Sequence, residues 1–362
     1  MKRGVSVVPW ANRGPTNLNV GRSDANVASP PPHLRIRLPM IADFLRFTVA
    51  ERHVLGDAYD ADAQARRVYE FLQEFFPGSG IVMEAERRGG RRGYTYHFEL
   101  LTPDGQPCGD VSFGGDRQRG TASIELTGAG CARVTAARPF AEAWGHVRRM
   151  LDAVGARITE YHAAHDDYAG TRNLATALEM YEAGQFDGAF KRPAIQRLGW
   201  NDGSGSTLYI GKKTATRQLV VYEKGREQGL RDGDEGVNWV RWEARFYARN
   251  RPIPTAVLEA PWEFVVSEYP ALSWISAVMS SFRTAVERSK ANIFRALRHC
   301  RRQYGGLLNL VAELSLDDHA LGAFVRRRIA RSCRPRWLQE NPLGRESIGV
   351  AFAAFVTAEP SV

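Results

Sequence analysis

Three stretches of this chain alternate apolar with polar residues and carry side chains that could do chemistry on a phosphate. They cover residues 206–211, 217–225 and 238–246. Alternation with a period of two is typical of strands that have one buried and one exposed face. On the exposed face the pattern places Tyr222, Lys224 and Glu243. A phenol is a potential nucleophile, a carboxylate can bind a divalent cation, and a lysine can neutralise a phosphate.

The register between the last two of these strands decides whether such a site exists. A shift of one residue in strand pairing turns every side chain to the opposite face of the sheet. We expect Val220 opposite Glu243 and Tyr222 opposite Arg241, which puts the phenol and the carboxylate on one surface. In this register Glu243 is a candidate metal ligand, but it could equally form an ion pair with Arg241 or Arg245.

The sequence RITEYHAAHDD at 157–167 offers further metal ligands. Glu160, His162 and Asp166 share one side of this expected strand, and same-side neighbours lie about 6.6 Å apart. Glu160 and His162 could therefore share an ion. Asp166 would lie about 13 Å from His162 and could join only if the chain bends after Ala164.

The order of the expected elements repeats along the chain. The first half has a strand, a helix, three strands and a helix, at 42–49, 61–76, 93–101, 110–114, 121–127 and 139–154, and the sequence GAGC at 128–131 breaks the pattern. The second half has a strand at 157–164, a helix at 171–183, the three strands described first, and a helix after Pro254. This predicts an α+β fold made of two related β-α-β-β-β-α lobes whose antiparallel sheets lie side by side or are fused.

Composition limits the kind of partner. The 362 residues carry a formal net charge of +9, which favours a polyanionic partner such as a nucleic acid. An arginine-rich genome would give the same excess of positive charge without such a partner. The spacing of the four cysteines argues against a zinc ribbon and gives no disulfide framework, so we expect reduced thiols. No run of eighteen apolar residues and no apolar signal core is found, so we expect a cytoplasmic protein without a membrane partner.

Two glycine-rich segments are expected to be loops. The basic segment 87–94 is either an arm that contacts DNA or a solvated loop, and 114–120 is expected to be a hairpin turn.

Several of these segments together resemble a known family. The runs TLYIGKK, VVYEKGREQG and WVRWEARF followed by RPIP are similar to the replication initiation factor family, the rolling-circle initiators of plasmids and filamentous phages. The similarity extends back through GYTYHF, VSFGGDRQRGTASIELTGAGC and RITEYHAAHDDYAG, and covers about residues 40–255. The resemblance implies a protein that nicks one origin strand with a tyrosine, stays attached to the 5′ phosphate, and then transfers the strand without needing ATP.

The resemblance also implies roles for individual residues. Tyr222 matches the tyrosine of the family's YEK-type motif, with Tyr209 as the alternative, because a turn at 212–216 would place Tyr209 near Gln218 on the same face. The family usually has a basic residue where this chain has Val220, so one phosphate contact is missing. Related initiators carry an acidic residue where this chain has His162, which shifts the expected cofactor, Mg²⁺ or Mn²⁺, toward manganese-like ions. The expected DNA contacts are Lys212, Lys213, Arg217, Lys224, Arg241 and Arg245.

With these roles, the chain divides into four regions. They are a disordered leader (1–32), an N-terminal lobe (33–155), a catalytic lobe (156–256) and a helical accessory region (257–362). The accessory region is expected to contain helices at 271–304, 306–314 and 320–332. The first has a basic side that is either a solvated face or a DNA contact. Expected partners are double- and single-stranded origin DNA, a host helicase and a second copy of the chain. The alternative function is a catalytically inactive, sequence-specific DNA-binding regulator on the same scaffold.

Overall fold

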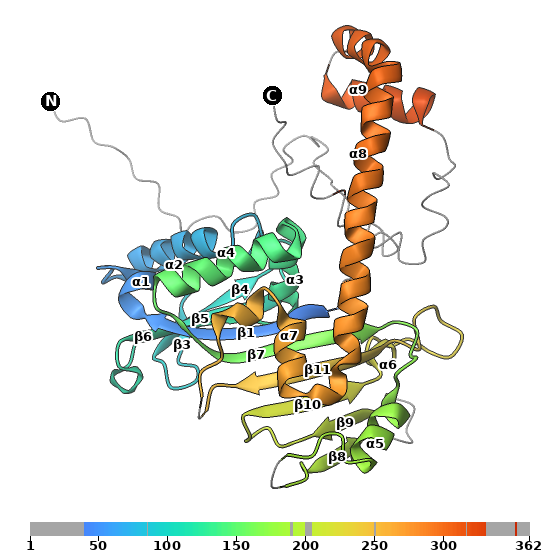
Figure 1. Cartoon of the computed structure of the whole chain (residues 1–362). Helices are drawn as coiled ribbons and strands as arrows, with labels where there is room; N and C mark the ends of the chain where they lie inside the picture. Colours follow the sequence, from blue (N-terminus) through green and yellow to red (C-terminus); the bar gives the residue numbers. More distant parts are fainter. Residues whose placement is uncertain are drawn as a thin grey trace, which may run out of the picture.

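The computed structural model describes residues 40–84, 86–188, 191–199, 205–249, 251–315 and 317–330, and Phe352. In this part of the chain the strands form one antiparallel sheet in the order β2-β4-β5-β6-β1-β7-β11-β10-β9-β8, with β3 paired to β4 (Figure 1). The strands are β1 (Met40–Ala50), β2 (Val82–Met83), β3 (Arg88–Gly89), β4 (Tyr96–Leu101), β5 (Pro107–Phe113), β6 (Thr121–Leu126), β7 (Arg157–Asp167), β8 (Ile195–Leu198), β9 (Thr207–Ile210), β10 (Arg217–Tyr222) and β11 (Val240–Tyr247).

The helices cover one side of this sheet, and the longest one extends away from it (Figure 1). They are α1 (Glu51–Leu55), α2 (Ala61–Phe75), α3 (Gly128–Ala137), α4 (Phe140–Ala153), α5 (Leu174–Glu182), α6 (Lys224–Glu227), α7 (Pro261–Glu268), α8 (Trp274–Leu314) and α9 (Asp318–Phe324). A turn of π-helix, Val325–Ile329, follows α9. None of the described helices is long and apolar enough to cross a membrane.

The predicted duplication is confirmed, and the two sheets are fused. The order β1-α2-β4-β5-β6-α4 is repeated as β7-α5-β9-β10-β11-α7, and β1 pairs with β7 where the lobes meet. At this seam Phe44 lies opposite His162, and their rings stack at 4.7 Å. Strands β6, β1, β7 and β11 are therefore neighbours, so residues of both lobes share one surface.

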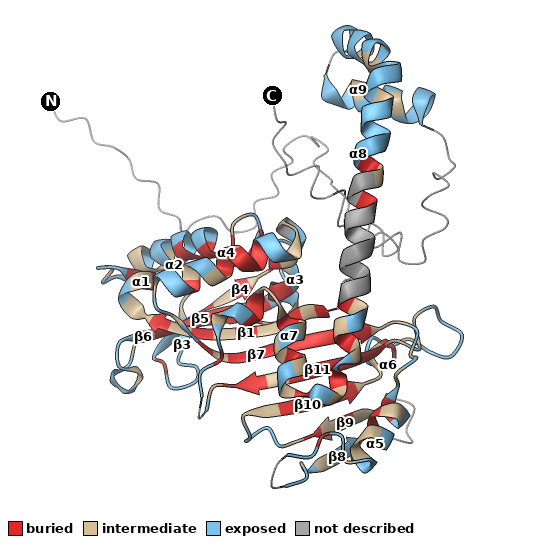
Figure 2. Cartoon of the chain, in the orientation of Figure 1, coloured by how far each residue is buried: buried red, intermediate tan, exposed pale blue. Residues whose placement is uncertain are grey.

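The hydrophobic core lies between the sheet and the helices. In the first lobe Phe47 of β1 stacks against Phe75 of α2. In the second lobe Phe246 packs edge-on against Phe264 of α7, and Trp242 packs edge-on against Trp274 of α8. Figure 2 shows the buried residues concentrated in the strands and on the inner sides of these helices. Apolar side chains thus occupy one side of the sheet, which leaves the polar ones on the other.

Three predicted boundaries were wrong, and two involve glycines that allow close backbone approach. The GAGC segment does not break the pattern but begins α3, where a Cβ on Gly130 would lie 2.4 Å from the Cys108 carbonyl oxygen. Strand β10 ends at Tyr222, and Lys224 begins α6, where a Cβ on Gly225 would lie 2.5 Å from two carbonyl oxygens. The predicted helices 271–304 and 306–314 are one helix, α8, because two glycines cost only about 2 kcal/mol relative to alanine.

The remaining segments singled out in the sequence are placed as follows. Residues 114–120 form the expected turn between β5 and β6. The basic segment 87–94 contains β3, so part of it belongs to the sheet. Cys108 and Cys131 are buried free thiols and Cys300 is half-buried. The leader 1–32, the fourth cysteine Cys333 and residues 345–351 and 353–362 lie outside the described residues.

Candidate active site

The side of the sheet away from the helices carries the candidate site. The predicted register is confirmed, because Val220 lies opposite Glu243 and Tyr222 opposite Arg241. The neighbouring pairing of β11 with β7 places Arg245 opposite His162 and Arg241 opposite Asp166. Paired residues share a face. Tyrosine, carboxylates, histidine and arginines from three adjacent strands therefore lie on one surface.

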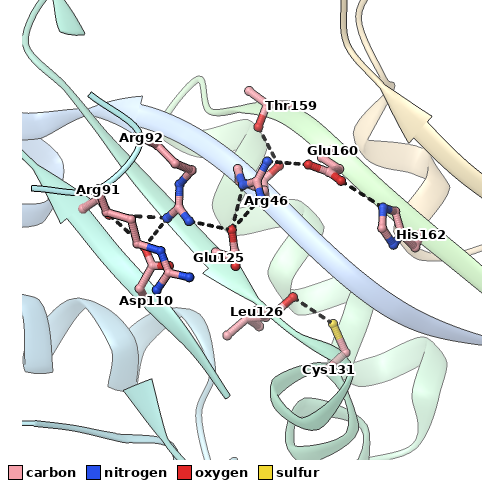
Figure 3. Close-up of polar contacts among 11 residues, drawn as sticks. Arg46, Arg91, Arg92, Asp110, Glu125, Leu126, Cys131, Thr159, Glu160 and His162 are labelled. Carbon is pink, nitrogen blue, oxygen red and sulfur yellow. Dashed lines mark hydrogen bonds and ion pairs between the residues drawn. The ribbon is translucent and has the colours of Figure 1, made fainter. Parts of the chain in front are cut away.

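One group on this surface, the histidine cluster, consists of Glu160, His162, Glu243 and Arg245. His162 lies between two carboxylates, with Nε2 3.0 Å from Glu160 Oε1 and Nδ1 2.9 Å from Glu243 Oε1. Arg245 Nε donates to Glu243 Oε1 at 2.8 Å. Arg46 of β1 forms an ion pair with Glu160, and Figure 3 shows the series of contacts from Arg46 through Glu160 to His162. Of the two ion pairs expected for Glu243, the structure contains the one with Arg245.

The histidine cluster is buried, and its charges stabilise one another. Burial lowers the pKa of His162, but the hydrogen bonds with Glu160 and Glu243 outweigh it and leave that pKa raised. Burial likewise acts to raise the pKa of Glu243, but the contacts with His162 and Arg245 lower it to about 2. His162 therefore lies between two carboxylates, with both ring nitrogens engaged.

A second group, the arginine cluster, consists of Asp43, Asp166 and Arg241. The Arg241 guanidinium donates from Nε to Asp166 Oδ1 at 2.7 Å and from Nη2 to Asp166 Oδ2 at 2.9 Å. Its Nη1 donates to Asp43 Oδ1 at 2.8 Å. Strand β7 continues to Asp167, so the bend that would bring Asp166 to His162 does not occur. Asp166 belongs to the arginine cluster and does not join the histidine cluster.

The two candidate tyrosines both lie on the polar face. Tyr222 is half-buried, with Lys224 Nζ 5.7 Å from its ring centroid. Burial and the charge of Glu243 raise its pKa, and Arg241 partly offsets them, so the phenol is protonated at neutral pH. Tyr209 lies opposite Val220, so it is on the face of Tyr222 and diagonal to Gln218, whose amide donates to the carbonyl of Gly211.

The predicted DNA contacts do not all lie on this face. Arg217 pairs with Phe246 on the helix side of the sheet, where its guanidinium stacks over Tyr269 and contacts Glu268. Lys212 and Lys213 are exposed in the loop between β9 and β10. Lys224, in contrast, forms an ion pair with Glu227. The two exposed loop lysines are therefore the freest of the predicted cations to reach a phosphate.

The sequence interpretation missed a polar network in the first lobe that continues this face. Glu125 of β6 accepts from Arg46 Nε at 2.8 Å and pairs with Arg92 Nη1 at 2.9 Å (Figure 3). Arg92 and Arg91 also form ion pairs with the fully buried Asp110 of β5. The segment 87–94 is thus partly anchored on its own sheet. The polar positions in the alternating strands β1, β5 and β6 were the signal that could have revealed this network.

A divalent cation fits the histidine cluster only with help from a substrate. In the part of the chain that the structure describes, no three histidine, cysteine or acidic side chains are arranged to hold a metal ion. Magnesium sites at phosphates commonly use one or two protein carboxylates and take their other ligands from the substrate and water. Glu160 and Glu243 are the carboxylates of this cluster that a cation could use, and each also pairs with an arginine, Arg46 and Arg245 respectively. His162 would add a nitrogen only on giving up one of its two contacts with them.

The open face of this α+β sheet thus carries a tyrosine, carboxylates and arginines from adjacent strands. Residues 156–323, which hold the second lobe, α8 and most of α9, match the family model described as replication initiation factor. Through this region the chain is similar to the replication initiation factor family.

A search of solved structures finds a structure similar to this chain, the rolling circle replication initiator protein from Geobacillus stearothermophilus. The two share 19% sequence identity, with a TM-score of 0.44, and the match covers 64% of this chain and 84% of that one. No curated protein matches this chain.

Proposed function

We propose that this protein initiates rolling-circle replication by nicking one strand of its origin DNA with Tyr222. The pairing of β10 with β11 carries the proposal, because it holds Tyr222 beside Arg241 and on the same face as Glu243. The match of residues 156–323 to the replication initiation factor family supports the biological role. Neither candidate tyrosine is part of the hydrophobic core, so both can be reached from the polar face.

In the proposed reaction the Tyr222 oxygen attacks the phosphorus of the scissile phosphodiester. The bond between phosphorus and the 3′ oxygen breaks, the phenol proton is lost, and the 3′ oxygen leaves as a hydroxyl after taking up a proton. The product is a 5′-phosphotyrosyl ester, which keeps the energy of the broken bond for strand transfer by the reverse reaction. Arg241 stabilises the developing phenolate, since its charge already acts to lower the pKa of Tyr222.

The remaining residues of the face position the DNA. Lys212 and Lys213 lie exposed at the end of β9 and would contact the phosphate backbone. Glu160, His162 and Glu243 are the residues that would hold Mg²⁺ or Mn²⁺, which when bound polarises the scissile phosphate. Origin DNA is the substrate in double- and single-stranded form. We also propose that a host helicase in the cytoplasm unwinds the nicked DNA, since the chain contains no GxxxxGK[ST] phosphate loop.

A nicking assay tests this function. Purified protein is incubated with supercoiled origin plasmid and Mg²⁺ or Mn²⁺, and the expected result is nicked circles that carry covalent protein at a 5′ end. A plasmid with a scrambled origin is the matched control and is expected to remain supercoiled. Specific retention of intact plasmid without nicking would instead identify the alternative, an inactive DNA-binding regulator.

The nature of the cation gives a second prediction. Chelator-treated protein is expected to be inactive until Mn²⁺ or Mg²⁺ is added, with Mn²⁺ preferred because His162 would supply a nitrogen ligand. The His162→Asp variant is expected to lower the Mn²⁺-to-Mg²⁺ ratio of nicking rates by about tenfold. Calorimetric titration with each ion measures the same change in affinity. His53→Asp, which changes a histidine in α1, is the control, and an unchanged ratio in His162→Asp would remove His162 from the cation site.

A further inference from the structure

Two aromatic residues lie on the polar face of the sheet at the ends of β7 and β11, and the proposed reaction does not use them. Tyr168 directly follows β7, and Trp239 directly precedes β11. Asp167 lies opposite Val240, so the next residues outward, Tyr168 and Trp239, meet across the end of the two strands. Their ring centroids are 5.1 Å apart. We call these two residues the aromatic pair.

The aromatic pair is next to the proposed nucleophile. Trp239 and Arg241 share one side of the chain, about 7 Å apart along it, and Arg241 lies opposite Tyr222. The Arg241 guanidinium carbon Cζ is 5.5 Å from the centroid of the Trp239 ring. Arg241, Trp239 and Tyr168 therefore form a continuous series of planar groups, which begins at the strand partner of Tyr222.

The aromatic pair is held in place by the chain around it. Gly170, with a φ of 66°, turns the chain after Tyr168, and a Cβ on this glycine would lie 2.5 Å from the Asn238 carbonyl oxygen. The Trp239 indole Nε1 donates to Asp166 Oδ1 at 2.8 Å, and the Tyr168 hydroxyl donates to Asp166 Oδ2 at 3.4 Å. One carboxylate thus holds the polar edges of both rings and leaves their faces for contacts with planar groups. A ligand would lose little free energy in ordering such a site.

The surroundings of the aromatic pair indicate a nucleic-acid base as its ligand. Both rings are only partly buried, on the side of the sheet that the helices leave uncovered (Figure 1). Proteins commonly bind single-stranded nucleic acid with aromatic rings beside cations, because the cations contact phosphates while the bases stack on the rings. Here Arg241 adjoins the rings, and Lys212 and Lys213 are exposed on the loop that precedes β10. The base must be unpaired, because base pairing and stacking in a duplex cover its flat faces.

We propose that the aromatic pair stacks against an unpaired base of the strand that Tyr222 cleaves, about one or two nucleotides from the scissile phosphate. Tyr168 is the last ring of the series and takes the base, while Trp239 supports Tyr168 and connects it to Arg241. Stacking tolerates every base, because each has a flat π-face, so the pair positions the strand and does not read its sequence. The identity of the strand rests on the proposed function, but stacking itself requires no cleavage.

Binding of single-stranded oligonucleotides without cleavage tests the proposal. The probes are a fluorescein-labelled oligothymidylate and an abasic oligonucleotide of the same length. Their affinities for the full chain are measured by fluorescence anisotropy at one salt concentration, with a chelator present, since phosphate contacts depend on salt. The ratio of the two affinities reports the contribution of the bases. Tyr168→Leu is expected to lower this ratio by about tenfold and to leave the affinity for the abasic chain unchanged.

Two further variants control this measurement. Tyr168→Phe keeps the ring and loses only the hydroxyl that contacts Asp166, so it is expected to keep the wild-type ratio. Tyr69→Leu removes a 45% exposed tyrosine ring from α2, on the helix side of the sheet, and is also expected to keep it. Circular dichroism verifies the fold of each variant. Equal affinities of the wild-type protein for the two probes, an unchanged ratio in Tyr168→Leu, or an equal fall in Tyr69→Leu would overturn the proposal.

Abasic substitutions in the origin strand locate the base relative to the nick. The bases of an origin oligonucleotide are removed one at a time, and single-turnover nicking is measured. One position beside the nick is expected to slow the wild-type protein by about tenfold and Tyr168→Leu by less than about twofold, because that variant has already lost the stack. An abasic effect of equal size in both proteins would contradict the stacking. If no protein nicked any probe while the affinity ratio behaved as expected, the proposed function would be wrong and the stacking site would remain.

Discussion

Tyr222→Phe is expected to abolish nicking and the covalent protein–DNA adduct while leaving origin binding intact. The substitution removes only the oxygen that would attack the phosphate, and the loss of a nucleophile costs at least about 10³-fold in rate. The ring stays beside Lys224 and Arg241, so the fold is expected to be retained. Single-turnover nicking of an oligonucleotide with the origin sequence measures the rate, and a denaturing gel detects the adduct.

Tyr209→Phe is the matched control for this result. Tyr209 lies on the adjacent strand β9, on the same face, and loses the same single oxygen when it is replaced. It is expected to nick at a rate within about threefold of the wild-type protein, as for a residue that does not take part in bond making. If Tyr209→Phe were inactive and Tyr222→Phe active, the nucleophile would be Tyr209. If both variants nicked normally, the tyrosine mechanism would be wrong.

Arg241→Met is expected to destabilise the protein by about 3–5 kcal/mol, which is a large part of the stability of an ordinary domain. Methionine keeps much of the volume but leaves Asp43 and Asp166, which Arg241 joins, without a counter-charge. Asp166 is then a buried anion and Asp43 a half-buried one, and leaving a buried charge unpaired costs more than the ion pair had contributed. Urea unfolding followed by tryptophan fluorescence measures the change.

The pH dependence of this variant provides an internal check. Burial already raises the pKa of Asp43, although Arg241 acts to lower it. Without Arg241 the folded-state pKa rises further, so the folded protein binds more protons than the unfolded chain and is stabilised as the pH falls. The deficit of Arg241→Met relative to wild type is therefore expected to be smaller near pH 4 than near pH 8.

Arg67→Met is the control for the loss of an arginine ion pair as such. Arg67 pairs with Glu70 on the exposed side of α2, where both side chains are about half exposed. Surface pairs contribute little, so its unfolding free energy is expected to change by less than about 1 kcal/mol. An equal loss of unfolding free energy in the two variants would show that the arginine cluster contributes no more to stability than an exposed ion pair.

The sequence by itself determined the repeated element order and the faces of the central strands. Side chains alternate strictly along a strand, so the pattern around Tyr222 and Glu243 specified which residues face the core. The same alternation determined the face of Glu243, because Trp242 and Phe246 can be buried only if Glu243 points the other way. The long helix α8 was also evident from its period, apart from its continuity through the two glycines.

Only the tertiary structure decided which polar groups meet. Arg46 and Asp43 are more than a hundred residues from the partners that they contact in the second lobe, and β1 reaches those partners because the duplicated lobes join edge to edge. His162 was predicted to be a metal ligand from the sequence, but its position between Glu160 and Glu243 depends on β7 lying beside β11. Strand order is set by burial of the whole apolar face and not by any local pattern. Residue types therefore predicted which groups lie on this face, while the packing of two lobes into one sheet decided which of them are in contact.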